Sequence, residues 1–447
     1  MTDTALITNG RPREAVARTP LMRRRLATLG SRSPLFYAEP LELVRGEKSW
    51  VIDSAGKRYL DAYNNVPHIG HSHPRVREAV CDALSQININ SRYLTEQPIA
   101  YAERLLATFE PGLERVMFVN SGSEANELAL RIARQHARGN GVLISDFSYH
   151  GNTTMLAQLT TGLTVREPLG EHVRAITIPD VPQGAGQAEI SAIVSSALVE
   201  ADEALASLAA SGHRVSAVLL DASFSTEGLP RVPAAYLQGL ADRVRSEGGL
   251  YIADEVQSGF GRLGSWMWGY QKYGLVPDLV TLGKPMGNGL PIGAVVLPSA
   301  LGDEFSSRNQ YFNTFATTAV PTAAAAAVLD EMDDAGLMSK AKATGEYLRA
   351  KLAALAPGLP QIADLRGDGL YLGIELTGDD GRPAAQTAGW LTEELRECGV
   401  LGARIGRYDN VMKVRPPLAF GRSDADVFAA AFADGLTAVL ASATGGC

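Results

Sequence analysis

A run of small and polar residues, Asn120-Ser121-Gly122-Ser123-Glu124-Ala125-Asn126, joins an apolar stretch to a helix-forming one. Small residues at the start of a helix allow its free backbone N–H groups to close on an anion, and the helix dipole adds to the attraction. The run therefore predicts a phosphate cradle. Taken alone, it is also compatible with an ordinary helix cap at Ser121 or Ser123.

Two further reactive groups are expected at strand ends. Asp254 and Glu255 close one apolar run, and Lys284 follows another, Leu279–Leu282. Open α/β sheets bind ligands at the C-terminal ends of their strands, where a buried carboxylate needs a cation as partner. A lysine would usually extend to solvent, but when it is desolvated its pKa falls and its amine becomes a nucleophile toward an aldehyde.

One ligand would use all three features. Pyridoxal phosphate has a phosphate for the cradle, a ring nitrogen that needs a negative partner, and an aldehyde that reacts with an amine. The sequence therefore predicts a pyridoxal-phosphate site in which Asp254 and Lys284 act on the cofactor.

Three other patterns resemble binding motifs but are interpreted as structural. The three histidines of the segment 68–74 have no carboxylate or thiol beside them in sequence, so we expect a turn and no metal site. Gly259–Gly264 fits GxGxxG, yet the residues 266–269 do not resemble the helix of a dinucleotide site. Pro285 stands where a P-loop needs serine or threonine.

The composition excludes several classes of protein. The chain has 447 residues, of which 46% are hydrophobic and 20% charged, and a net charge of −8, so it is neither disordered nor basic enough to indicate nucleic acid binding. We see no apolar run of the roughly 20 residues that a membrane helix needs. The three cysteines are far apart, and the N-terminal residues lack the apolar core of a signal peptide. A cytoplasmic location is the expectation.

The elements that must position these residues alternate between strands and helices from about residue 100 onward. The expected strands are 115–120, 141–146, 216–221, 250–255, 278–283 and 292–298, with helices over 123–137 and 234–249. Apolar strands separated by helices predict an α/β fold with a mainly parallel sheet covered on both faces. An exposed helix over 188–212 is expected to cover the edge of this sheet.

The two ends of the chain follow different patterns. A hairpin around 53–57 and a helix over 74–87 are expected near the N-terminus. The pattern changes again after residue 325 to a smaller α+β arrangement that ends in a helix over 425–441. The predicted organisation is an arm at 1–34, an N-terminal part of a small domain at 35–80, a large cofactor-binding domain at 81–330 and the C-terminal part of the small domain at 331–447.

The runs 254–262 and 282–284 resemble the signature of the class III (subgroup II) aminotransferases, and the resemblance extends from about residue 35 to the C-terminus. This family has pyridoxal-phosphate fold type I, and its members are similar in forming homodimers with shared active sites. The resemblance implies that Lys284 forms the Schiff base with the cofactor and later moves the proton, and that Asp254 pairs with the pyridine nitrogen. It further implies that Gly122 and Ser123 bind the phosphate, Tyr149 stacks on the ring, Val256 packs on the other face, Gln257 lies near the ring hydroxyl and Thr314 reaches the phosphate of the neighbouring subunit.

The sequence departs from the family pattern in two places. Members usually have Thr-aromatic-Gly-Gly-Asn-Pro where this chain has the segment 314–321 without those glycines. Many also have a carboxylate-binding arginine where this chain has Lys413, and an arginine occurs instead at Arg415. We therefore take Tyr63, Lys413 and Arg415 as candidate substrate contacts.

The resemblance leaves the reaction open. Our first hypothesis is an aminotransferase, which moves an amino group from an amine or amino acid to a carbonyl acceptor in ping-pong half reactions. Specialised metabolism is one setting in which such enzymes occur. The segments 63–66, 311–314 and 410–413 resemble a subgroup that also contains phospholyases of phosphorylated amines, so phosphate elimination is the alternative. Racemase or epimerase chemistry shares the same first steps. A non-catalytic regulator would be expected to have lost Lys284 or Asp254.

Overall fold

The computed structural model describes residues 19–30 and 35–444. Most of the predicted arm at 1–34, and Cys447, lie outside these residues. The described part of the arm forms helix α1 (Pro20–Leu29), which Thr19 caps by accepting a hydrogen bond from the Met22 N–H.

The large sheet has seven strands in the order β4-β10-β9-β8-β7-β5-β6. Their bounds are β4 (Arg115–Val119), β5 (Gly141–Ser145), β6 (Val173–Ile176), β7 (Val215–Asp221), β8 (Leu250–Asp254), β9 (Leu279–Leu282) and β10 (Gly293–Leu297). Only β10 runs antiparallel to its neighbours, β4 and β9, within the described sheet, so the prediction of a mainly parallel sheet is confirmed. The edge strand β6 was not predicted, because its four residues include an arginine and make no apolar run.

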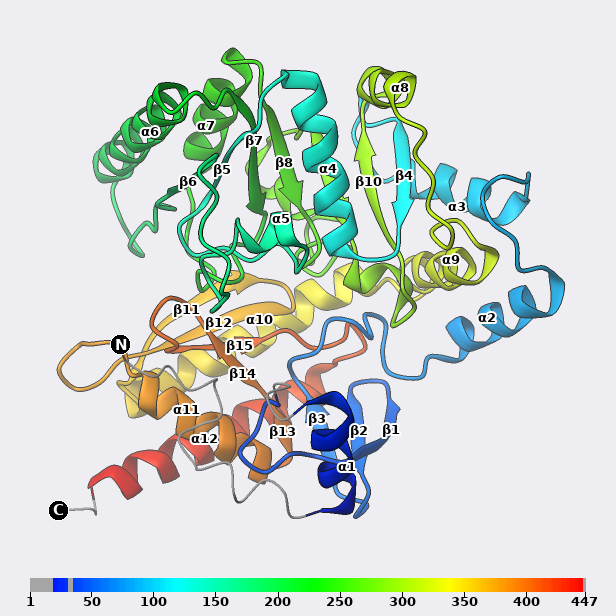
Figure 1. Ribbon diagram of the computed structural model, residues 1–447. Coiled ribbons are helices and arrows are strands. Elements are labelled where there is room, and N and C mark those ends of the chain that lie inside the picture. Colours follow the sequence, from blue (N-terminus) through cyan, green and yellow to red (C-terminus); the bar gives the residue numbers. More distant parts are fainter. Residues whose placement is uncertain (1–18, 31–34, 445–447) are drawn as a thin grey trace.

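The central strands are buried on both faces, which explains their unbroken apolar sequences. In β7, Ala217 and Leu219 pack with helix α4 (Gly122–Ala137), whereas Val218 and Leu220 pack with helix α7 (Ala234–Ser246). The long helix α6 (Gln187–Ala210) lies beside α7 and the edge strand β6, as predicted (Figure 1).

Two smaller sheets complete the fold (Figure 1). One is built from β1 (Leu43–Glu47), β2 (Trp50–Asp53) and β3 (Arg58–Asp61), which include the predicted hairpin, and is completed by β13 (Val400–Leu401) from the other end of the chain. The other is antiparallel and contains β11 (Ile362–Asp368), β12 (Tyr371–Leu376), β15 (Val411–Val414) and β14 (Ala403–Ile405). The two chain ends therefore meet in one sheet.

The remaining helices pack around these sheets. They are α2 (Pro74–Gln86), α3 (Glu96–Leu106), α5 (Thr154–Ala157), α8 (Ser299–Arg308), α9 (Ala319–Asp334), α10 (Leu337–Leu355), α11 (Ala385–Glu397) and α12 (Arg422–Thr444), with short 3₁₀ helices η2 (Gly269–Tyr273), η3 (Lys284–Gly287) and η4 (Ala356–Gly358). The predicted domain limits at 80/81 and 330/331 fall inside α2 and α9, which pack against each other. The limits themselves stay a prediction.

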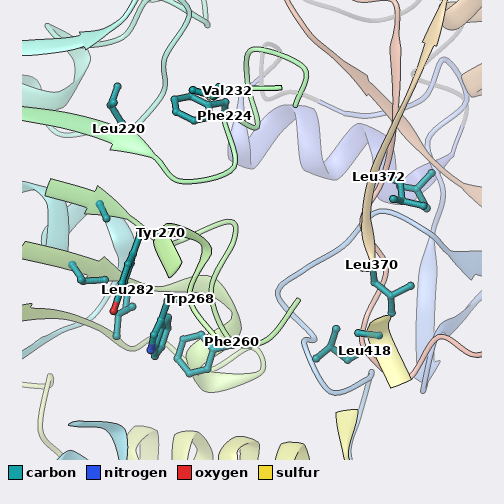
Figure 2. Packing of buried hydrophobic residues seen from close by; sticks show 14 of the residues in the cluster. Leu220, Phe224, Val232, Phe260, Trp268, Tyr270, Leu282, Leu370, Leu372 and Leu418 are labelled. Carbon is teal, nitrogen blue, oxygen red and sulfur yellow. The ribbon is translucent and has the colours of Figure 1, made fainter. Parts of the chain in front are cut away.

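One hydrophobic core runs through both parts of the molecule. Leu282 and Trp268 of the large domain belong to the same buried cluster as Leu370 and Leu418 from the C-terminal part (Figure 2). Among the described helices, α12 alone is long and apolar enough to cross a membrane, by length and composition only. Its apolar residues Phe428, Phe432 and Leu436 belong to this core, as in a helix of a globular domain.

Candidate active site

The residues singled out in the sequence gather at the edge of the large sheet where the parallel strands end. Asp254 is the last residue of β8, Lys284 follows β9 after one glycine, and α4 begins just after β4. These ends surround a cavity of about 320 Å³. Its lining includes seven of the predicted cofactor contacts, Gly122, Ser123, Tyr149, Asp254, Val256, Gln257 and Lys284.

The Asp254 carboxylate is buried and held by three donors. Its Oδ2 lies 2.8 Å from the Asn126 amide nitrogen and 2.8 Å from His150 Nδ1, and its Oδ1 accepts from the Val256 N–H. Thr281 in turn donates to Asn126 Oδ1 over 2.6 Å, which fixes the orientation of that amide. Because these neighbours fix its position, the carboxylate is held at the cavity, where it can pair with a ring nitrogen.

Asn126 and His150 are the two functional neighbours that sequence reasoning missed. Asn126 lies within the run 120–126 and His150 follows Tyr149, but their partner Asp254 is more than 100 residues away from each. His150 Nε2 is also buried without a hydrogen-bond partner among the described residues, as expected beside a cavity that a polar group fills.

Unlike its neighbour Asp254, Glu255 has a structural role. Its carboxylate accepts hydrogen bonds from Ser258 Oγ and from the backbone N–H groups of Gly269 and Tyr270 at the start of η2. Burial raises the pKa of Glu255 to about 7, while these donors act in the opposite direction. Since adjacent residues of a strand face opposite sides, only one carboxylate of the pair can face the cavity.

Lys284 has the environment of a nucleophilic amine. Its backbone φ of 33° lies in the left-handed region, which places the residue in a tight turn at the start of η3. Burial, together with the nearby positive charge of Arg415, lowers the pKa of the Lys284 amine below its ordinary value. A larger fraction of neutral amine is therefore available to react with an aldehyde.

The predicted phosphate cradle is closed by contacts that only glycine permits. A Cβ on Gly122 would lie 2.8 Å from Val256 Cγ2, and one on Gly283 would lie 2.9 Å from the Gly122 nitrogen. Ser121 caps α4 by accepting from the Glu124 N–H, so the ordinary cap also exists, while Gly122 and Ser123 line the cavity. The backbone donors at the start of α4, the glycine cradle, Asp254 and Lys284 together fit pyridoxal phosphate.

Thr314, the eighth predicted contact, does not line this cavity and is exposed. Its neighbour Asn313 accepts from Asn120 and donates to Glu124, each over 2.9 Å, so the altered loop is anchored beside the start of α4. The predicted contact of Thr314 with a neighbouring subunit stays a prediction.

The three candidate substrate residues lie together next to the cavity. Lys413 of β15 is buried, with its Nζ 5.7 Å from the centre of the Tyr63 ring and 5.8 Å from that of Tyr371. Arg415 lies 5.2 Å from the Tyr63 ring and donates both to the Tyr63 carbonyl and to Gln257 Oε1. Gln257 thus joins the cavity lining to Arg415.

These residues create an excess of positive charge. Burial, with the charges of Arg415 and Lys284, holds the pKa of Lys413 well below its ordinary value. Within the described part of the chain, none of these three cations forms an ion pair with a carboxylate. Buried charge without a partner is costly, so the cluster favours a bound anion.

The other motifs have structural roles. His68 is buried between the Phe260 carbonyl and Arg262, whereas His71 pairs with Asp61 and His73 with Glu331. The three imidazoles thus bind separate partners, and no group of metal-binding side chains occurs in the described residues. Gly259–Gly264 forms a tight turn that leads to η2 and not to the long helix of a dinucleotide site, as predicted.

Comparison with known proteins places this geometry in a family. The model of the class-III aminotransferases matches residues 37–436. The chain belongs to this family. A phospholyase from Arthrobacter, solved in complex with phosphoethanolamine, is 53% identical, covers 93% of this chain and 99% of its own, and superposes with a TM-score of 0.92.

Curated relatives of this class III enzyme carry two kinds of name. An alanine–glyoxylate aminotransferase 2-like protein from Drosophila melanogaster is 37% identical over 96% of this chain and 90% of its own. An ethanolamine-phosphate phospho-lyase homologue from Caenorhabditis elegans is 34% identical over 90% of each chain. The family establishes fold type I and pyridoxal phosphate as the cofactor, but its names divide between transfer and elimination.

Proposed function

We propose that this class III enzyme is a phospholyase that eliminates phosphate from a small phosphorylated amine such as phosphoethanolamine. The observation that carries the proposal is the pair of buried cations, Lys413 and Arg415, which lies beside Lys284 without a carboxylate partner in the described residues. A substrate with an amine at one end and a phosphate at the other matches this arrangement. The phosphoethanolamine complex of the 53% identical Arthrobacter enzyme supports it.

Each residue of the site has a role in this proposal. Pyridoxal phosphate, when bound, supplies an aldehyde for the amine and a ring that withdraws electrons from the adjacent carbon. Asp254 keeps the ring nitrogen protonated, and Gly122 and Ser123 bind the cofactor phosphate. Lys284 removes the proton from the carbon that bears the nitrogen. Tyr149 and Val256, which both line the cavity, would pack on the two faces of the ring.

Lys413 and Arg415 would bind the substrate phosphate and stabilise it as it leaves. The bond between the second carbon and the ester oxygen breaks, and its electron pair leaves with the phosphate. Lys284 holds the proton lost from the first carbon and passes it to the leaving phosphate, and its amine then displaces the enamine product from the cofactor. Water then hydrolyses the enamine product to an aldehyde and ammonia, so the net reaction consumes one water and needs no carbonyl acceptor.

Transamination, our first hypothesis from the sequence, is the second candidate. The relatives named aminotransferase favour it, and the same Lys284 and Asp254 would serve it. The runs 254–262 and 282–284, which resemble the aminotransferase signature, are the basis of that hypothesis. The partnerless cation pair now ranks elimination ahead, because transfer to a carbonyl does not by itself require a phosphate site.

Substitutions in the cation pair separate phosphate recognition from the cofactor chemistry. Lys413→Met should raise KM for phosphoethanolamine about 10- to 150-fold, because it removes a charge-assisted contact. Its KM for ethanolamine, the same amine without phosphate, should change less than about threefold. Arg243→Gln, at a partly exposed arginine of α7 that pairs with Asp202, is the control. Equal effects on both amines would contradict the proposed phosphate site.

We also propose that the enzyme is a homodimer whose sites lie at the interface. Exposed apolar side chains gather near Thr314, among them Leu94, which is 96% exposed, and Phe315, which is 68% exposed. The two segments that carry them meet where Arg92 lies 4.1 Å from the Phe312 ring. A second copy of the chain would cover this surface.

A further inference from the structure

A second and larger cavity, of about 560 Å³, lies between the loop after β7 and the strands β11 and β12. These two strands lie below the large sheet in Figure 1. Four cationic side chains line it, Arg231, Lys272, Arg349 and Arg366, against the single carboxylate of Asp368. Apolar residues such as Leu229 and Val232 complete the lining. The cavity lining is thus rich in cationic side chains and partly apolar.

Three of these cations already have carboxylate partners. Arg231 binds Asp364 through two nitrogens, and Lys272 lies 2.8 Å from Asp368. Arg366 also contacts Asp364, as well as two further acidic residues outside the cavity lining. Their charges are therefore largely compensated.

Arg349 differs from the other three. Its guanidinium donates to the carbonyl oxygens of Leu365 and Gly367, and it has no carboxylate within ion-pair distance among the described residues. Partial burial lowers the pKa of Arg349, although the nearby charges of Asp368 and Asp364 act in the opposite direction. Ser223 Oγ in the same lining is buried and also lacks a hydrogen-bond partner among these residues.

We propose that this cavity is a second anion site, which takes inorganic phosphate or a small phosphate monoester with Arg349 and Ser223 as its principal donors. The proposal does not rest on the reaction proposed above. Tyr371 lines the cavity and also lies beneath Lys413 and Arg415, with ring distances of 5.8 Å to each. An anion bound in the cavity would therefore alter the affinity of the substrate site, because both sites border this ring.

Calorimetric titration of the holoenzyme with inorganic phosphate tests the site. The titration uses a Lys413→Met, Arg415→Met background, in which the cation pair no longer binds phosphate. We expect saturable binding to one site per chain. Adding Arg349→Gln should weaken it about 10- to 150-fold, as for loss of a charge-assisted hydrogen bond, whereas Arg243→Gln should leave it unchanged.

A parallel titration with glycerol phosphate shows whether the cavity prefers inorganic phosphate or a phosphate monoester. Tighter binding of the monoester would show that the apolar lining contributes to its affinity. Lys272→Gln provides a second variant at the exposed side of the cavity, with an expected weakening of about two- to fivefold. Absence of saturable phosphate binding in the background protein would overturn the proposal. So would affinities that neither the Arg349 nor the Lys272 substitution changes in folded protein.

Discussion

At the scale of single residues, the Asp254 carboxylate shows how a reactive group is prepared by distant neighbours. Asn126 and His150 hold one of its oxygens, each at 2.8 Å. Asp254→Asn keeps the shape but loses the charge that holds the ring-nitrogen proton. Turnover should fall about 100-fold or more, with unchanged circular dichroism. Asp303→Asn, at an exposed aspartate, is the control. Rates within about twofold of wild type would exclude this role.

We expect the buried Lys413, a proposed phosphate contact, to lower the free energy of unfolding of the protein. Its pKa in the folded protein lies well below that in the unfolded chain, so between the two values the unfolded chain binds more protons and stability rises with pH. Lys413→Met removes this dependence. At pH 7 its free energy of unfolding should exceed that of wild type by about 0.5–2 kcal/mol, and the gain should shrink as pH rises toward 10. Urea titrations at several pH values measure this. A variant less stable than wild type at pH 7 would contradict it.

The reactive residues themselves could be predicted from the sequence because strand ends mark them. Lys284 and Asp254 each follow an apolar run, and parallel strands end at a common edge. Their partners could not be predicted in the same way. The contact of Arg415 with Gln257 joins side chains 158 residues apart, and nothing local in either segment specifies it.

At the scale of elements, the start of α4 must approach the turn after β8 closely. A Cβ on Gly122 would meet Val256 Cγ2 at 2.8 Å, so Gly122→Ala must displace the helix or the valine. Overpacking of this size costs about 1–3 kcal/mol, which corresponds to roughly 5- to 150-fold weaker cofactor binding. Equilibrium dialysis followed by cofactor absorbance measures it. Gly358→Ala is the matched control, since a Cβ there would meet no atom within 4 Å. Equal affinities for the two variants would show that the cradle is not the cofactor site.

Elements with a strong local pattern were predictable, and weak ones were not. The buried strands β7 and β8 and the amphipathic helix α2 occur where periodicity placed them. The two-residue strand β13 exists only because β3 lies beside it, with Val400 opposite Leu60. Tertiary pairing, and not local sequence, creates such an element.

At the scale of the whole molecule, a substitution in the altered loop at Thr314 tests the proposed dimer. Because Thr314 is exposed and outside its own cavity, its removal should affect the cofactor only through a partner subunit. Thr314→Ala should weaken cofactor binding about 10- to 150-fold, or less if Thr317 or Thr318 replaces the hydroxyl. Sedimentation should give the mass of two chains. A fully active monomer would disprove the shared site.

The most direct measurement of the proposed elimination is phosphate release without any carbonyl acceptor. Holoenzyme is mixed with excess phosphoethanolamine, and inorganic phosphate is counted per active site, with Lys284→Ala as the blank. Elimination predicts many phosphates per site, with matching ammonia and aldehyde. No phosphate, together with at most one carbonyl product per site, would contradict the account and establish transfer instead.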